Sequence, residues 1–271
     1  MSDVILVVLG HAEAARELLH AAAEFKRLLG GAHINALAVK EPVHISALQA
    51  EVLVMEGDAL VARMDKEHER VAALETIYGQ WLAEAGDIAQ HTRWIEAEGN
   101  AAAVVGERGS RADVIVAGQP GDRGRRIRQL FRAALFGTDR PVLMVPAGWH
   151  GTLGSCVAIA WRDDRPAARA VIPALRWLAA AERVHVLAGT RHGARPEMPK
   201  VLVEHGIRAE LHALAIGSGP FGQTLLDTAH EIGADLLVMG AYTHSPLREL
   251  ILGGVTQYML DHADLPVLMR H

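Results

Sequence analysis

The chain has 271 residues, of which about half are apolar, and its formal net charge is -5. This length is enough for one large domain or two ordinary ones with sizeable cores. The net negative charge gives no general attraction to nucleic acid or to an anionic membrane surface, so neither is expected as a partner.

Cysteine and histidine usage narrows the chemistry further. The single cysteine, Cys156, excludes an internal disulfide and any CxxC motif. The 15 histidines include no HxxxH pair, no HExxH motif and no Cys/His cluster, so no metal site is expected.

The start of the chain, MSDVILVVLGHAEAARELL, has a short apolar run but no basic segment and no cleavage site typical of a secretory signal. No apolar run approaches the length of a membrane span. We therefore expect a soluble, cytoplasmic protein.

The first half alternates between strand-like and helix-like patterns. Continuous apolar runs predict strands at residues 4–9, 34–39, 92–97, 113–117 and 141–145. Apolar residues at helical spacing predict helices at residues 14–29, 47–85, 100–108 and 125–136. The segment 47–85 is a long insert whose apolar stripe, from Leu53 to Trp81, is typical of a core or an interface and could also serve dimerisation or partner docking.

The second half repeats this alternation after a glycine-bearing linker at residues 147–152. Strands are predicted at residues 155–161, 184–188, 208–215, 236–240 and 267–269, and helices at 166–181, 199–205, 224–232 and 245–259. We therefore predict two domains, one spanning residues 1–147 and the other residues 153–271.

An internal repeat relates the two halves. The sequence ADVIVAG at residues 112–118 matches ADLLVMG at 234–240, and RPVLM at 140–144 matches LPVLM at 265–269. Each half thus predicts a doubly wound, Rossmann-like α/β domain with a five-stranded parallel sheet. The fold class is therefore α/β, with two such domains in tandem.

The last segment carries the strongest candidate site. The apolar strand ending at Gly240 is followed by a turn containing Thr243 and by a helix that is interrupted at Gly253 and Gly254. A strand, a glycine turn and a helix in this order place backbone N–H groups and a helix dipole at the carboxyl edge of a parallel sheet. This edge is suited to an anion such as a phosphate.

This segment resembles the C-terminal signature of the universal stress protein (UspA) family, G-x2-G-x9-G-[S/T]. The pattern falls here on Gly240, Thr243, Gly253 and Gly254, with threonine replacing the second glycine and glycine replacing the final hydroxyl residue. Together with the repeat, the resemblance covers nearly the whole chain. It implies a tandem pair of adenine nucleotide alpha hydrolase-like domains packed as a pseudo-dimer, with adjoining fifth strands at residues 142–144 and 267–269.

The resemblance also implies a nucleotide site in the second half, for ATP or another adenine nucleotide with Mg²⁺ accompanying it. Its residues carry over to the ends of three strands and to the following loop and helix: Ala160, Trp161, Asp163, Ala188, Met239, Gly240, Thr243, Gly253, Gly254, Val255 and Thr256. The family's usual acidic residue at the end of the first strand is replaced by Arg162, so Asp163 takes its place after a shift of one residue.

The corresponding site in the first half is predicted to be degenerate and occluded. Gly118 and Gly121 keep the family's interval, but the bulky Phe131 stands where the third glycine belongs. Five arginines surround this loop, between Arg123 and Arg132. They could clamp a phosphate or an acidic partner, although a solvated helix face is the more common role of such a run.

The resemblance points to a stress-response regulatory or binding protein with an unknown protein partner, as an intramolecular pseudo-dimer or additionally a homodimer. A first alternative is a slow ATPase or nucleotide hydrolase, for which the sequence offers Asp163, Asp164 and His244 but no clear catalytic base. A second alternative is a nucleotide-free scaffold that acts through its surfaces. No catalytic residue is assigned.

Overall fold

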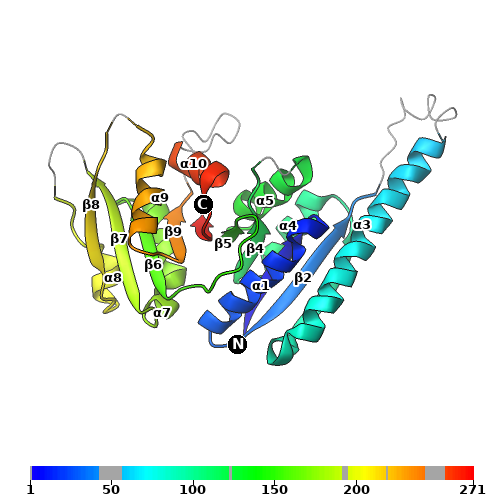
Figure 1. The fold of residues 1–271 in the computed structure, drawn as a ribbon, viewed down its shortest axis with the longest axis horizontal. Helices are drawn as coiled ribbons and strands as arrows, with labels where there is room; N and C mark the ends of the chain where they lie inside the picture. Colours follow the sequence, from blue (N-terminus) through cyan, green and yellow to red (C-terminus); the bar gives the residue numbers. More distant parts are fainter. Residues whose placement is uncertain (1, 43–56, 122–123, 191–194, 218, 242–253) are drawn as a thin grey trace.

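The computed structural model of the chain describes residues 2–42, 57–121, 124–190, 195–217, 219–241 and 254–271 (Figure 1). The first half contains β1 (Asp3–Leu9), α1 (Ala12–Leu28), β2 (Ala32–Lys40), α3 (Gly57–Glu84), β3 (Thr92–Glu98), α4 (Ala101–Gly109), β4 (Val114–Gly118), α5 (Arg125–Gly137) and β5 (Val142–Val145). Every strand predicted for this half is present. The predicted insert at 47–85 is seen as α3, and residues 47–56 lie outside the described residues.

The second half contains β6 (Cys156–Trp161), α6 (Arg165–Val171), α7 (Leu175–Leu178), β7 (Arg183–Thr190), α8 (Lys200–Glu204), β8 (Glu210–Ala215), α9 (Phe221–Glu231), β9 (Leu236–Gly240), α10 (Gly254–His262) and β10 (Val267–Arg270). The single helix predicted at 166–181 was wrong: a 3₁₀ turn at Ile172–Ala174 separates α6 from α7. Pro173 lies in that turn and has no N–H to continue the α-helical ladder.

The ten strands form one sheet in the order β3-β2-β1-β4-β5-β10-β9-β6-β7-β8. Within each half all strand pairs are parallel, and the α/β fold class with two doubly wound halves is confirmed. The two halves join through β5 and β10, which pair antiparallel. The predicted adjoining of the fifth strands is therefore also confirmed, and the joint is a hydrogen-bonded ladder. The division at residues 147 and 153 stays a prediction.

Two apolar layers cover the sheet, and each layer contains buried residues from both halves. One layer comes from α1 and α3 in the first half and from α6, α7 and α8 in the second. The other layer comes from α4 and α5 in the first half and from α9 and α10 in the second. Alanine, valine and leucine dominate both layers, as expected for parallel strands buried on both faces.

The insert helix α3 packs against α1 and β2 at the outer end of the first half (Figure 1). Its second part carries the buried residues Val71, Leu74, Tyr78 and Trp81, so this part of the predicted stripe is core. Earlier in the helix, Val61 and Met64 are exposed. No helix among the described residues is both long enough and apolar enough to cross a membrane.

Candidate functional site

The predicted site residues at the strand ends of the second half come together. Ala160 of β6 pairs with Met239 of β9, and Trp161 pairs with Ala188 of β7. These three strands are neighbours in the sheet and end at the same carboxyl edge. Such an edge is where open α/β sheets bind ligands.

Gly240 ends β9 at this edge, but its role differs from the predicted turn. A Cβ atom at this position would lie 2.7 Å from the carbonyl carbon of Pro166 and 2.9 Å from the nitrogen of Ala167. The backbone φ of Gly240 is not in the left-handed region. Glycine is therefore required here because the first turn of α6 packs directly on the strand.

The two carboxylates that follow β6, Asp163 and Asp164, have different surroundings. Asp164 is the N-cap of α6, where its side chain accepts a hydrogen bond of 3.1 Å from the N–H of Ala167, and it also pairs with Arg162. Asp163 is exposed, and the described residues provide it with no hydrogen bond or ion pair. Of the two carboxylates, Asp163 is therefore the one available to a ligand. His244, the other residue named for a hydrolase, lies outside the described residues.

Among the described residues α10 spans Gly254–His262; Gly254 is exposed, and no described atom lies within 4 Å of the position that a Cβ would take there. Val255 is half-buried and Thr256 is fully buried. Glycine has no side chain, so a ligand can approach its backbone closely. Thr243 and Gly253, which complete the predicted site, lie outside the described residues.

The matching region of the first half is filled by α5. Ile127, Leu130 and Phe131 pack over the ends of β1 and β4, and Phe131 is only 1% exposed. They leave a cavity of about 10 Å³, lined also by Gly10 and Gly118. This space is far smaller than the volumes of ligand pockets.

An ion-pair network from α3 and α5 closes the ends of β1 and β2. Glu67 of α3 accepts hydrogen bonds from Arg70, the nearest at 2.8 Å, and from Arg126 of α5 at 2.9 Å. Arg70 also donates to the backbone oxygens of Gly10 and Val39, at 3.0 and 2.5 Å. The insert therefore covers the strand ends that would face a nucleotide in the first half.

The predicted arginine run does not act as one unit. Arg126 belongs to this network and is 19% exposed, whereas Arg128 donates to the oxygen of Gly121 at 3.4 Å. Arg132 lies over the ring of Phe136, 5.8 Å from its centroid. Arg123 lies outside the described residues.

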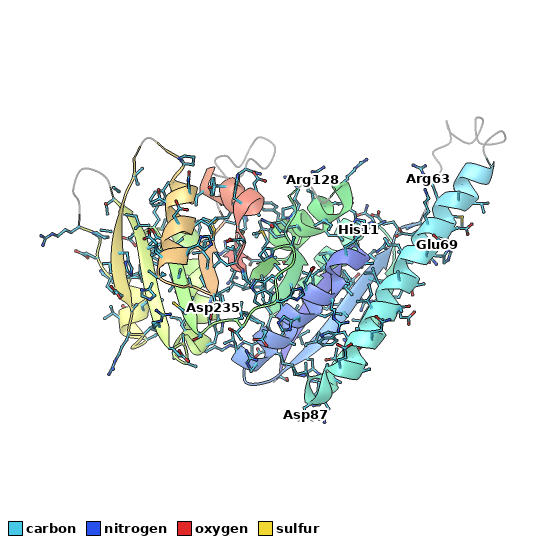
Figure 2. All side chains as sticks on the ribbon, in the orientation of Figure 1. His11, Arg63, Glu69, Asp87, Arg128 and Asp235 are labelled. Carbon is cyan, nitrogen blue, oxygen red and sulfur yellow. The ribbon has the colours of Figure 1, made fainter. Side chains whose placement is uncertain are left out.

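The network alters the titration of its members. Burial alone would raise the pKa of Glu67, but hydrogen bonds from Arg70 and the Glu41 N–H, with the charges of Arg70 and Arg126, lower it from 4.5 to about 2. His11 follows β1, and its pKa is shifted as well (Figure 2). Burial lowers the pKa of His11, and the charges of Arg126 and Arg70 act in the same direction.

A larger cavity of about 690 Å³ lies between the two halves. Its wall includes Phe25 and Trp177, whose rings meet edge-on at 5.9 Å, and the ion pair between Arg176 and Asp3 at 2.8 Å. The sequence gives no sign of this cavity, because its lining comes from segments far apart in the chain.

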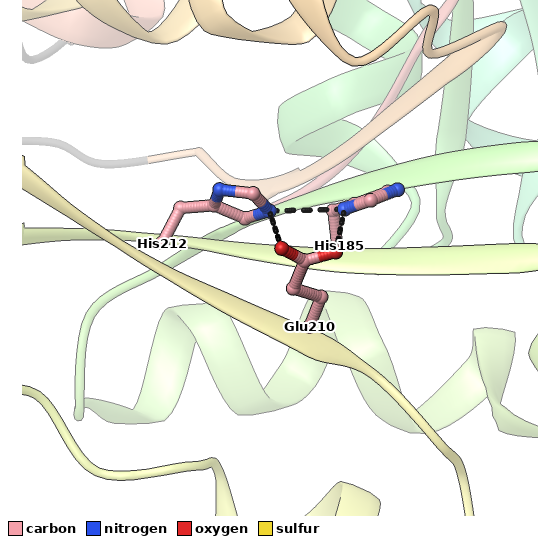
Figure 3. A group of neighbouring side chains, drawn as sticks. All are labelled: His185, Glu210 and His212. Atoms are coloured by element: carbon pink, nitrogen blue, oxygen red, sulfur yellow. Dashed lines mark hydrogen bonds and ion pairs between the residues drawn. The ribbon is translucent and has the colours of Figure 1, made fainter.

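The structure also brings together three metal-ligating side chains that no sequence motif indicated: His185, Glu210 and His212 (Figure 3). One ligand atom from each lies within 4.8 Å of the others. The common histidine motifs have helical spacing, and this cluster does not. The signal that could have found it is Glu210-x-His212 on a strand, where side chains two apart share a face.

The fold defines a class: a tandem of doubly wound α/β units joined through their last strands. Comparison with known proteins supports this assignment of the fold. The model of the Universal stress protein family matches residues 163–271. These residues belong to the universal stress protein family, and both halves of the chain have a fold seen in its members.

Solved structures extend the likeness to the whole chain. A universal stress protein from Archaeoglobus fulgidus DSM 4304 is 18% identical, with a TM-score of 0.74, covering 100% of this chain and 98% of that one. A functionally unknown protein from Pseudomonas aeruginosa PAO1 is 16% identical, with a TM-score of 0.62, covering 99% of this chain and 92% of that one. At these identities the likeness establishes the fold. No curated protein matches the chain.

Proposed function

We propose that the protein is a stress-response regulatory protein whose second half binds ATP or another adenine nucleotide. The observation that carries this proposal is the convergence of Ala160, Ala188 and Met239 at one carboxyl edge of the sheet. The family match over residues 163–271 supports it, because this range contains the glycine signature.

The described part of the site fits the groups of a nucleotide. Gly254 has no side chain and no described atom near the position of a Cβ, which suits close approach of a phosphate to its backbone. Asp163 offers an exposed carboxylate that could accept hydrogen bonds from ribose hydroxyls. A bound Mg²⁺ would neutralise phosphate charge, with carboxylate and water oxygens as its preferred ligands.

The contrast between the halves supports one nucleotide per chain. In the first half Ile127, Leu130 and Phe131 fill the space over the strand ends, and Phe131 stands at the motif position that Gly253 holds in the second half. A single occupied half would make the pseudo-dimer asymmetric. The nucleotide could regulate a partner only if the two conformations or complexes differ in their affinity for it.

The test is to release small molecules from the purified protein by heat, identify them by mass spectrometry, and then titrate the emptied protein with ATP by calorimetry. We expect one adenine nucleotide per chain. Gly254→Val should weaken binding at least 10-fold, because its side chain would stand where the phosphates approach. The Tm should be nearly unchanged, since no described atom lies within 4 Å of the new Cβ.

Gly79→Val is the matched control, because Gly79 is exposed on α3 and likewise has no described atom within 4 Å of a Cβ. It should leave ATP affinity unchanged. An empty protein that neither binds nor is stabilised by ATP would overturn the nucleotide proposal and favour the scaffold. Steady release of phosphate that is lost in Asp163→Ala would favour the slow ATPase.

A further inference from the structure

Two neighbouring strands bring His185, Glu210 and His212 onto one face of the sheet (Figure 3). His185 of β7 pairs in register with Glu210 of the edge strand β8, and Leu187 pairs with His212. Residues two apart on a strand point to the same face, so Glu210 and His212 both flank His185.

We propose that these three side chains form a binding site for one divalent transition-metal ion of the zinc class. Nδ1 of His185 lies 2.9 Å from Nε2 of His212, and the Glu210 carboxylate oxygens lie 3.7 and 3.9 Å from these two nitrogens. Two imidazoles and one carboxylate are a ligand set that zinc uses where a fourth position is left open to water.

The spacing is close to what such an ion needs. Two nitrogen ligands at roughly 2.0–2.1 Å in tetrahedral geometry stand about 3.3 Å apart. The histidine nitrogens must therefore separate by a few tenths of an ångström from their present 2.9 Å. The Glu210 side chain is 70% exposed, so it is free to swing toward the ion.

Burial gives the three ligands different roles. The side chain of His185 is 9% exposed and fixes one ligand atom, whereas that of His212 is 24% exposed. The Glu210 side chain is 70% exposed and that of His212 is 24% exposed, so an ion and its water ligand can reach the site from solvent.

Two features limit the affinity. Nε2 of His185 is buried and has no hydrogen-bond partner among the described residues, whereas metal-bound histidines usually donate from the second ring nitrogen. Arg183, two residues before His185, also acts on it as a positive charge. A missing partner of this kind typically costs 10- to 100-fold in affinity, so we expect binding weaker than at a structural zinc site.

This site is independent of the proposed nucleotide site. His185 pairs with Ala158 on β6, whereas the nucleotide residues are at the carboxyl end of that strand, where Trp161 pairs with Ala188. Metal binding should therefore persist in Gly254→Val, and its failure would leave the nucleotide proposal untouched.

The test uses the full-length protein, stripped with a chelator, and titrates it with Zn²⁺ against a chromophoric competitor. Co²⁺ serves as a spectroscopic probe, since its visible absorption reports ligand number and geometry. We expect one ion bound more tightly than the background from the chain's other histidines. His212→Ala should weaken that site at least 10-fold and remove the four-coordinate cobalt spectrum, and Glu210→Gln should weaken it less.

His205→Ala is the matched control, because His205, like His212, is not buried, and it lies at the end of α8, outside the cluster. It should leave the tight site unchanged. Circular dichroism should show that both histidine variants stay folded, since neither His205 nor His212 is buried. The proposal is overturned if the protein has no site above background, or if His212→Ala and His205→Ala bind Zn²⁺ as the unmodified chain does.

Discussion

Leu143 of β5 and Leu268 of β10 are register partners at the centre of the antiparallel ladder that joins the two halves. Both are buried, and on either side of them Met144 pairs with Val267 and Val142 with Met269. The ladder is thus almost self-complementary, as expected at the pseudo-twofold axis of a repeated domain. The two halves share one sheet and two apolar layers through this joint.

Removal of the first half should expose the edge of β10. We expect a fragment of residues 153–271 to form a homodimer, because β10 can pair antiparallel with a second β10 about Leu268. Size-exclusion chromatography with light scattering would measure the mass. Leu268→Arg in the same fragment should prevent the dimer by placing a charge in the ladder, and a folded, monomeric unmodified fragment would contradict the prediction.

Gly240 should tolerate substitution less well than Gly254, the other described glycine of the predicted signature. Gly240→Ala places a Cβ 2.7 Å from the backbone of Pro166, and backbone cannot move aside as a side-chain tip can. Overpacking of this kind costs about 1–3 kcal/mol, which urea unfolding would detect. Gly254→Ala is the control, because no described atom lies near its Cβ; equal stability losses in the two variants would refute the packing explanation.

Most of the fold follows from local patterns in the sequence. The apolar runs match the strands because both faces of the parallel sheet are covered, so every strand residue tends to be apolar. Ile115 and Val238, for example, are fully buried in opposite layers. The repeat of RPVLM and LPVLM identifies the two strands as equivalent, and the family resemblance predicts that they join the halves. The break at Pro173 was missed because the apolar spacing continues across it, and periodicity alone does not register a lost N–H.

The candidate sites were less predictable, because their residues meet only through tertiary structure. The signature identifies the carboxyl edge of β9, but it cannot show that Gly240 is needed for contact with α6. The partners of Arg126 lie on the insert, at Glu67, so a run of arginines gives no sign of the network. His185 and His212 are 27 residues apart, and only strand pairing brings them together.

Asp235 explains part of the internal repeat. Its carboxylate accepts hydrogen bonds from the N–H groups of Gly154, Ser155 and Cys156 at 2.8, 2.8 and 3.2 Å, ahead of and at the start of β6. Among the described residues, its counterpart Asp113 accepts one hydrogen bond, from the N–H of Val4 of β1 at 2.8 Å. The repeated aspartate thus holds the first strand of each half.

Removal of the two aspartates should have unequal effects. Asp235→Ala leaves three N–H groups without their acceptor and should lower the free energy of unfolding by about 2–4 kcal/mol, whereas Asp113→Ala should cost about 1 kcal/mol. Urea denaturation of both variants would measure the difference. A larger loss for Asp113→Ala would show that the number of bonds does not determine the contribution.

Glu67 should make the first half sensitive to acid. Its pKa of about 2 lies below the ordinary value of 4.5, so the folded state favours the charged form. The stabilisation is complete above pH 4.5 and is lost as the pH falls toward 2, because the unfolded chain takes up the proton first. The shift corresponds to at most about 3 kcal/mol, reduced by solvent screening.

Glu67→Gln removes this pH-dependent stabilisation and leaves Arg70 and Arg126 without their shared carboxylate. We expect it to destabilise the protein by about 2–3 kcal/mol at pH 7, since it breaks a half-buried pair, and by progressively less as the pH falls below 4.5. Glu69→Gln is the control, because Glu69 is exposed on the same helix and should show no such dependence. Urea midpoints between pH 7 and pH 3 would measure both differences. If the cost of Glu67→Gln is the same at every pH, the carboxylate charge does not hold the network together, and the apolar packing of Phe131 would then be what closes the first half.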